Sequence, residues 1–284
     1  MPTVTANGVS TYYETHGDGP PVLIMHGLFG GDPVGRAEAS GDAIQALDGV
    51  GQVITYARRN AGKSAYTLDH YGLPDLAADA RALLDSLGID RSIIVGNSMG
   101  GMVALQYALD YPENVPAMSL VQTGPALMAS TGYGPPMTRV VERAAKEGDR
   151  TLFESRIDRI RNPLFVEGMN AQGHEQRVQM LAKLSNDELF TLSTGEIRNF
   201  EAFIGFDYTE RLGDIKGPAS IIHGNEDPLV SFENAGILKN GIPHAELTVI
   251  EGAGHGLLEY EEARAALRDW VELNANPEGR VAGG

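Results

Sequence analysis

Residues 93–101 read IIVGNSMGG, a short β-branched strand that runs into a glycine-framed turn and then into a helix. Glycines stand two residues before and two residues after Ser98. A very sharp strand-to-helix turn requires them, because larger side chains would collide there. Such a turn pushes the serine hydroxyl clear of the sheet. The stretch therefore predicts a nucleophile elbow with Ser98 at its tip.

Two downstream segments supply the partners that a serine nucleophile needs. A serine hydroxyl reacts poorly near neutral pH, so a histidine must accept its proton and a carboxylate must orient that histidine. Asp227 follows the apolar strand predicted at 219–224, and His255 follows the one predicted at 247–250. Since loops at the carboxyl ends of parallel strands share one edge of a sheet, we expect Ser98, Asp227 and His255 to meet there.

Strand and helix patterns alternate along most of the chain, which favours an α/β fold with a mostly parallel sheet covered on both faces. Between residues 124 and 206 the strand signal disappears and helical periodicity replaces it. We expect a helical cap (lid) insertion at 124–206 in a core domain formed by 1–123 and 207–284. Strands are expected at 4–6, 10–15, 22–25, 52–56, 93–95, 118–122, 219–224 and 247–250, and helices at about 73–87, about 99–109 and from about 258.

The composition narrows the classes of function. The absence of cysteine excludes disulfides, thiolate catalysis and cysteine zinc sites. His16, His70, His174, His223 and His244 form no pair with an acid that suggests a zinc site, so we expect no metal. A net charge of −16 opposes binding to nucleic acid or acidic membranes. With no leader pattern and no long apolar run, we expect a cytoplasmic protein without membrane insertion. The sequence carries no sign of its oligomeric state.

The chain resembles the α/β-hydrolase superfamily over nearly its whole length. Four segments carry the resemblance, namely His26-Gly27-Leu28-Phe29-Gly30, the elbow Gly96–Gly100, Gly224–Pro228 and Gly252–His255. The resemblance implies an α/β-hydrolase fold, a mostly parallel central sheet with helices on both faces and an inserted helical cap. It also implies that no cofactor is needed and that the backbone N–H groups of Leu28 and Met99 form an oxyanion hole.

The sequence offers a second candidate for the acid and a rival motif for nucleotide binding. Glu226 also follows the strand at 219–224, but Asp227 directly precedes Pro228, as in similar sequences, and is preferred as the acid. Gly62-Lys63-Ser64 looks like the end of a phosphate-binding loop. The leading glycine of that motif would fall at Ala57, so nucleotide binding is disfavoured.

We therefore predict a serine hydrolase that cleaves a carboxylic ester or lactone through an acyl-enzyme on Ser98. Its partner would be a small molecule with an ester, a lactone or an activated carbonyl. The elbow also resembles that of the hydrolases that cleave C–C bonds in ring-fission products. Those relatives usually have a tryptophan where this chain has Gly256. A cofactor-free perhydrolase or acyltransferase is a further alternative. A small-molecule receptor that uses the same fold is the non-enzymatic one.

Overall fold

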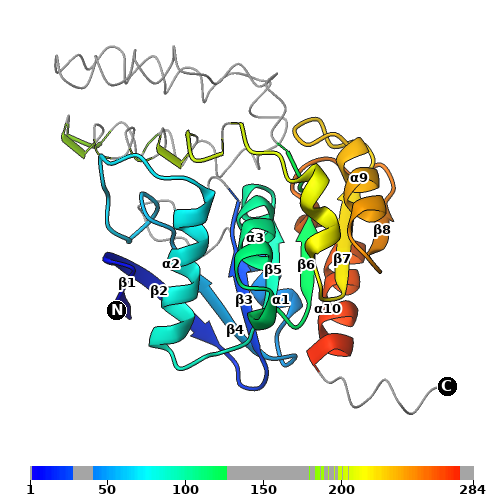
Figure 1. Cartoon of the computed structure of the whole chain (residues 1–284), viewed down its shortest axis with the longest axis horizontal. Helices are drawn as coiled ribbons and strands as arrows, with labels where there is room; N and C mark the ends of the chain where they lie inside the picture. Colours follow the sequence, from blue (N-terminus) through cyan, green and yellow to red (C-terminus); the bar gives the residue numbers. More distant parts are fainter. Residues whose placement is uncertain are drawn as a thin grey trace.

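The computed structural model describes residues 2–27, 41–126 and 205–275, and single positions or short runs between 179 and 203. Within these ranges eight strands form one sheet in the order β1-β2-β4-β3-β5-β6-β7-β8 (Figure 1). The antiparallel hairpin of β1 and β2 lies at one edge, and β3 to β8 are parallel to one another. The strands are β1 (Thr3–Ala6), β2 (Val9–His16), β3 (Pro21–Met25), β4 (Gln52–Tyr56), β5 (Ile93–Asn97), β6 (Met118–Val121), β7 (Ala219–Gly224) and β8 (Glu246–Ile250).

Helices cover both faces of this sheet. One face packs against α2, α3 and α9, and the opposite face packs against α1 and α10 (Figure 1). Three short 3-10 turns, η2, η4 and η5, complete the described elements. The bounds are α1 (Gly41–Ala46), α2 (Leu73–Ser86), α3 (Met99–Asp110), η2 (Pro112–Asn114), η4 (Thr209–Asp214), α9 (Glu233–Gly241), η5 (Leu257–Glu259) and α10 (Glu261–Ala275).

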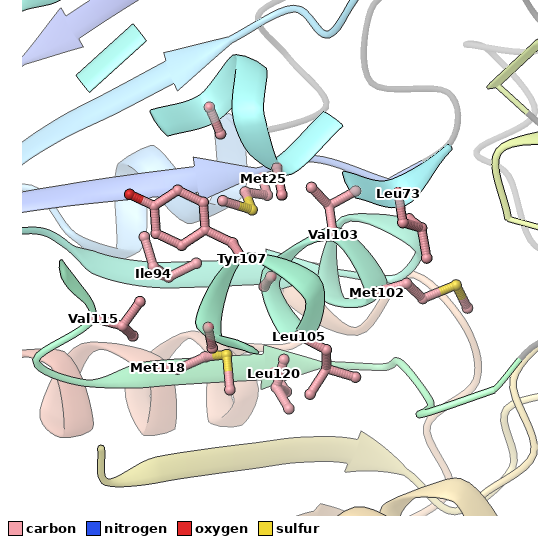
Figure 2. Close-up of a cluster of buried hydrophobic side chains, with 14 of the residues drawn as sticks. Met25, Leu73, Ile94, Met102, Val103, Leu105, Tyr107, Val115, Met118 and Leu120 are labelled. Carbon is pink, nitrogen blue, oxygen red and sulfur yellow. The ribbon is translucent and has the colours of Figure 1, made fainter. Parts of the chain in front are cut away.

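The central strands are apolar on both sides because both faces are covered. In β3, Leu23 and Met25 join the core under α2 and α3, whereas Val22 and Ile24 join the core under α10. Side chains of a strand point alternately to the two faces, so a fully buried strand reads as one continuous apolar run. Figure 2 shows the first of these cores, in which residues of α3 pack over the strands. The predicted α/β fold with a mostly parallel, doubly covered sheet is confirmed.

Most of the predicted cap lies outside the described residues. The two ends of the predicted cap, near Pro125 and near Tyr208, are adjacent. Ala126 pairs with Asp207 in an antiparallel bridge, and the Tyr208 amide donates to the Pro125 carbonyl at 2.9 Å. Everything between them can therefore be an insertion that leaves the sheet unchanged. The division into a core at 1–123 and 207–284 and a cap at 124–206 stays a prediction.

Two glycines bring the beginning of α3 into direct contact with the sheet. A Cβ on Gly96 would lie only 2.6 Å from the Gly101 Cα atom, and a Cβ on Gly100 would overlap the Met25 carbonyl of β3. Close approach of two backbones is possible only where side chains are absent. The turn at Ser98 is consequently so tight that this residue takes φ 53° and ψ −124°, a left-handed region that favours glycine.

We predict that Gly100→Ala strongly destabilises the fold, because its new methyl group would meet backbone rather than a flexible side chain. The free energy of unfolding, measured by urea denaturation, should fall by about 3 kcal/mol. Gly236→Ala is the matched control, since nothing lies within 4 Å of a Cβ there. In the α9 helix this control should gain about 0.5–1 kcal/mol. Equal stability of Gly100→Ala and the parent would contradict this account of the turn.

Candidate active site

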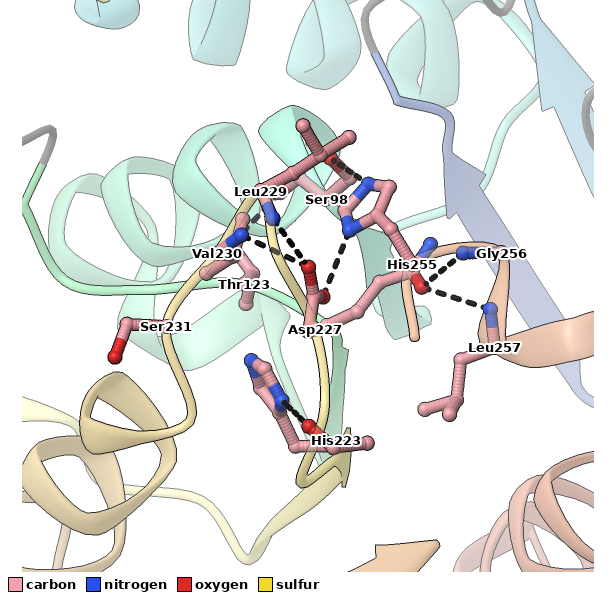
Figure 3. A network of polar contacts seen from close by, with 12 residues as sticks. Ser98, Thr123, His223, Asp227, Leu229, Val230, Ser231, His255, Gly256 and Leu257 are labelled. Carbon is pink, nitrogen blue, oxygen red and sulfur yellow. Dashed lines mark hydrogen bonds and ion pairs between the residues drawn. The ribbon is translucent and has the colours of Figure 1, made fainter. Parts of the chain in front are cut away.

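Ser98 projects from the turn between β5 and α3, at the carboxyl edge of the sheet (Figure 3). Two neighbours hold its strained backbone. The Ser98 amide donates to the Val121 carbonyl at 2.9 Å, and the Thr123 hydroxyl donates to the Ser98 carbonyl at 2.7 Å. A strained residue persists only where the surrounding structure over-determines it, and such residues cluster at functional sites.

His255 contacts both of its predicted partners. Its Nδ1 lies 2.8 Å from Asp227 Oδ2, and its Nε2 lies 3.1 Å from Ser98 Oγ (Figure 3). A carboxylate can only accept, so Nδ1 carries the proton and Nε2 is free to accept one from the serine hydroxyl. The structure thus brings together three side chains that are far apart in sequence, in the order that proton transfer from Ser98 requires.

Asp227 is ionised at the inner end of this chain. Its side chain is 0% exposed. Burial alone would raise its pKa, but the hydrogen bond and charge of His255 and the amides of Leu229 and Val230 outweigh burial, so the pKa lies below its usual value. The two amides donate to Oδ1 at 2.8 and 2.9 Å, respectively. Glu226, the competing acid, is exposed to solvent. The geometry therefore favours Asp227.

One of the two predicted oxyanion donors is described. Met99 is the first residue of α3, where a backbone N–H has no helical carbonyl to bond. Leu28 lies outside the described residues. The preceding Gly27 does border the site, since a Cβ built on it would lie 3.8 Å from Ser98 Oγ. The chain from β3 therefore passes beside the nucleophile.

His26, at the start of that chain, is buried beside a cation. Burial first, and the Arg58 charge second, hold the pKa of His26 well below its usual value, so the ring is neutral. The Arg58 guanidinium donates to the carbonyl of His26 and, at 3.0 Å, to that of Gly27. These contacts fix the backbone beside Ser98. They give His26 a structural position and no route to act as a second base.

Sequence analysis missed the polar residues at the end of β6. Besides Thr123, the Gln122 side chain bonds to Asn97 and to the loop that carries His255. The pattern that identified Asp227, a polar residue after an apolar strand, is present at Gln122 as well, and both strands end at the same sheet edge. Gln122 was not predicted as a site residue, because a carboxamide cannot transfer protons in a triad.

The family comparison agrees with this geometry. The family model described as "alpha/beta hydrolase fold" matches residues 20–262. The chain belongs to the α/β-hydrolase family. It is therefore a hydrolase of the α/β fold, and the predicted resemblance is confirmed.

Relatives of this α/β hydrolase carry several names. A protein named as a carbamate hydrolase, from Variovorax paradoxus, is 31% identical over 252 residues, which are 86% of this chain and 88% of the relative. A bifunctional esterase/perhydrolase from Acinetobacter calcoaceticus is 26% identical over 265 residues, with 89% and 92% covered.

Two solved structures share the fold. An enol-lactonase from Burkholderia xenovorans superposes with a TM-score of 0.72 at 22% identity, covering 95% of this chain and 98% of that one. A meta-cleavage product hydrolase from Pseudomonas fluorescens does so with a TM-score of 0.72 at 23% identity, covering 98% of each chain. At these identities the likeness concerns the fold alone.

Two absences concern only the part of the chain that the structure describes. Within it, histidine and carboxylate side chains nowhere gather in groups of three that could bind a metal ion. No helix there combines the length and the apolar character needed to cross a membrane.

We predict that His223, which lies near Asp227 in Figure 3, makes stability depend on pH. Burial lowers the pKa of His223, whose Nδ1 donates to the Gly224 carbonyl at 3.0 Å. As pH falls below about 6.5, the unfolded chain binds a proton at this histidine while the folded state does not. The free energy of unfolding therefore decreases, by up to about 1.4 kcal/mol per pH unit.

His223→Asn tests this, because an asparagine amide can keep the bond to Gly224 and does not titrate. Urea unfolding at a series of pH values from 7.5 downward should give a shallower decline for the variant than for the parent. The buried neutral His26 leaves a residual slope in both proteins. Identical slopes would show that His223 is protonated equally in the folded and unfolded states.

Proposed function

We propose that this α/β hydrolase cleaves a carboxylic ester or lactone through an acyl-enzyme on Ser98. The observation that carries the proposal is the position of His255, whose two ring nitrogens lie 2.8 Å from Asp227 Oδ2 and 3.1 Å from Ser98 Oγ. This arrangement can remove the serine proton at the moment of attack. Ester and lactone cleavage require nothing beyond it.

In the first half of the reaction, Ser98 Oγ attacks the substrate carbonyl carbon as His255 Nε2 takes the hydroxyl proton. The carbonyl oxygen becomes an oxyanion, which the Met99 N–H and, by resemblance to the family, the Leu28 N–H stabilise. Each such donor contributes about 3 kcal/mol in comparable enzymes. The imidazolium then protonates the leaving oxygen, the C–O bond breaks, and the acyl group remains on Ser98.

In the second half, water takes the place of the leaving alcohol. His255 removes a proton from the water as its oxygen attacks the acyl carbon, and the proton then passes to Ser98 Oγ as the ester to the enzyme breaks. Asp227 keeps its negative charge throughout. It stabilises the imidazolium in both halves and holds the ring in the required tautomer.

C–C bond hydrolysis is the second candidate, favoured by the elbow sequence at 96–101. Gly256 disfavours C–C bond hydrolysis, because the C–C hydrolases that this elbow resembles usually have a tryptophan at that position. Perhydrolysis or acyl transfer would replace water by another acceptor on the same acyl-enzyme, as the name of the Acinetobacter relative suggests. The names of other relatives add carbamates to the bonds to be tested.

We predict that Ser98→Ala and His255→Ala each lower turnover of p-nitrophenyl acetate by about 10⁴- to 10⁶-fold, because the triad acts as one unit. Asp227→Asn should cost about 10⁴-fold by imposing the wrong histidine tautomer. Glu226→Gln is its matched control, an adjacent exposed acid that should leave turnover at the parent value. Full activity of purified Ser98→Ala, or a larger loss in Glu226→Gln than in Asp227→Asn, would overturn the assignment.

A substrate panel separates the candidates. Short esters, lactones, aryl carbamates and dienoic ring-fission acids would be compared by kcat/KM on the wild-type protein. We predict the highest values for esters or lactones. Preferential cleavage of the ring-fission acids would support the C–C candidate instead. Binding of panel members without turnover of any of them would support a receptor.

A further inference from the structure

Gln122 is a buried side chain that the mechanism above does not use. It directly follows β6, is 4% exposed and takes φ 43°, again in the left-handed region. Its backbone amide donates to the Ile222 carbonyl of β7 at 2.9 Å. Side-chain hydrogen bonds explain why Gln122, a polar residue with a strained backbone, is buried at this position.

One end of the carboxamide holds the histidine loop. Gln122 Oε1 accepts the amides of Gly256 and Leu257 at 2.9 and 2.8 Å, the two residues directly after His255. Figure 3 shows both amides pointing to the same side of the loop. Glycine flanks His255 on both sides, and Gly256 takes φ 95°. Such a backbone is intrinsically loose, so it needs an external constraint.

The other end of the carboxamide reaches the nucleophile turn. Gln122 Nε2 donates to Asn97 Oδ1 at 2.9 Å, and Asn97 is the residue before Ser98. A planar amide group thus spans the elbow and the histidine loop, which lie 157 residues apart in the chain. The two catalytic side chains themselves are joined by the 3.1 Å hydrogen bond between His255 Nε2 and Ser98 Oγ.

We propose that Gln122 is a positioning residue that sets the separation between His255 Nε2 and Ser98 Oγ. The inference rests on the proposed function of these two side chains. Loss of the amide contacts lets the glycine-flanked loop shift, and a misplacement of about 1 Å can cost about 100-fold in rate. The ground-state binding of substrate does not depend on this contact, so the loss falls on kcat and not on KM.

The test compares three substitutions at Gln122 with one elsewhere. Gln122→Leu removes the contacts at similar size, and Gln122→Asn is too short by one methylene to span both ends. Gln122→Glu still accepts both amides, while Asn97 can rotate its amide to donate. Gln106→Leu is the matched control, because Gln106 is also buried and hydrogen-bonded but lies in α3, where it contacts Asp110 and Tyr208.

Two kinetic measurements are made on each folded variant. They are kcat and KM for p-nitrophenyl acetate and the rate of fluorophosphonate labelling at Ser98. We expect kcat and the labelling rate to fall about 100-fold in Gln122→Leu and Gln122→Asn with KM unchanged. Gln122→Glu should restore most of the rate, and Gln106→Leu should keep the parent rate even though it lowers the melting temperature. A parent rate in Gln122→Leu or Gln122→Asn would overturn the inference.

Hydrogen exchange adds a readout that is independent of activity. Amides of the peptide covering 252–258 should exchange faster in Gln122→Leu than in the parent, and at the parent rate in Gln106→Leu. Unchanged exchange in Gln122→Leu would overturn the inference. If Ser98 of the parent protein is not labelled, the proposed function is wrong, and the inference, which rests on it, is wrong as well. If the parent labels and Gln122→Leu labels equally fast, the inference alone fails.

Discussion

The contact between the first turn of α3 and the backbone of β3 and β5 is the constraint on which the rest of this molecule depends. It exists because Gly96 and Gly100 carry no side chain, since a Cβ at either position would overlap neighbouring backbone. The tight turn holds Ser98 in a strained backbone conformation with φ 53°. This turn makes the hydroxyl project from the sheet edge, beside the backbone N–H of Met99 at the start of α3.

The polar chemistry gathers where the parallel strands end. The strands are mostly apolar on both faces, whereas polar residues stand at their carboxyl ends: Asn97 ends β5, and Gln122, Asp227 and His255 follow strands. A buried carboxylate is costly unless it is paired and hydrogen-bonded. Asp227 has two backbone amides and the histidine as partners, so it stays charged in a buried position. The Asp227 carboxylate can then stabilise an imidazolium without itself becoming protonated.

The strands, and the meeting of Ser98, Asp227 and His255 at one sheet edge, were predictable because the segments that carry them have clear local patterns. β7 matches its prediction, and α2 differs only at its C-terminal end, because continuous apolar runs and helical periodicity report burial directly. The short α1 and the nine-residue α9 were missed, since few of their residues are buried and their periodicity is weak. Gln122 was missed for another reason. Its position after an apolar strand was visible in the sequence, but its role depends on two partners that only the tertiary fold brings within reach.

The most direct test of the central claim is to trap the covalent intermediate. The parent protein is mixed with excess p-nitrophenyl acetate, quenched in acid during turnover, digested and analysed by mass spectrometry. The account predicts one acetyl group on the peptide that contains Ser98 and none on that peptide in Ser98→Ala. Turnover with no acyl group on Ser98, or an acyl group on another residue that disappears at the rate of turnover, would contradict it.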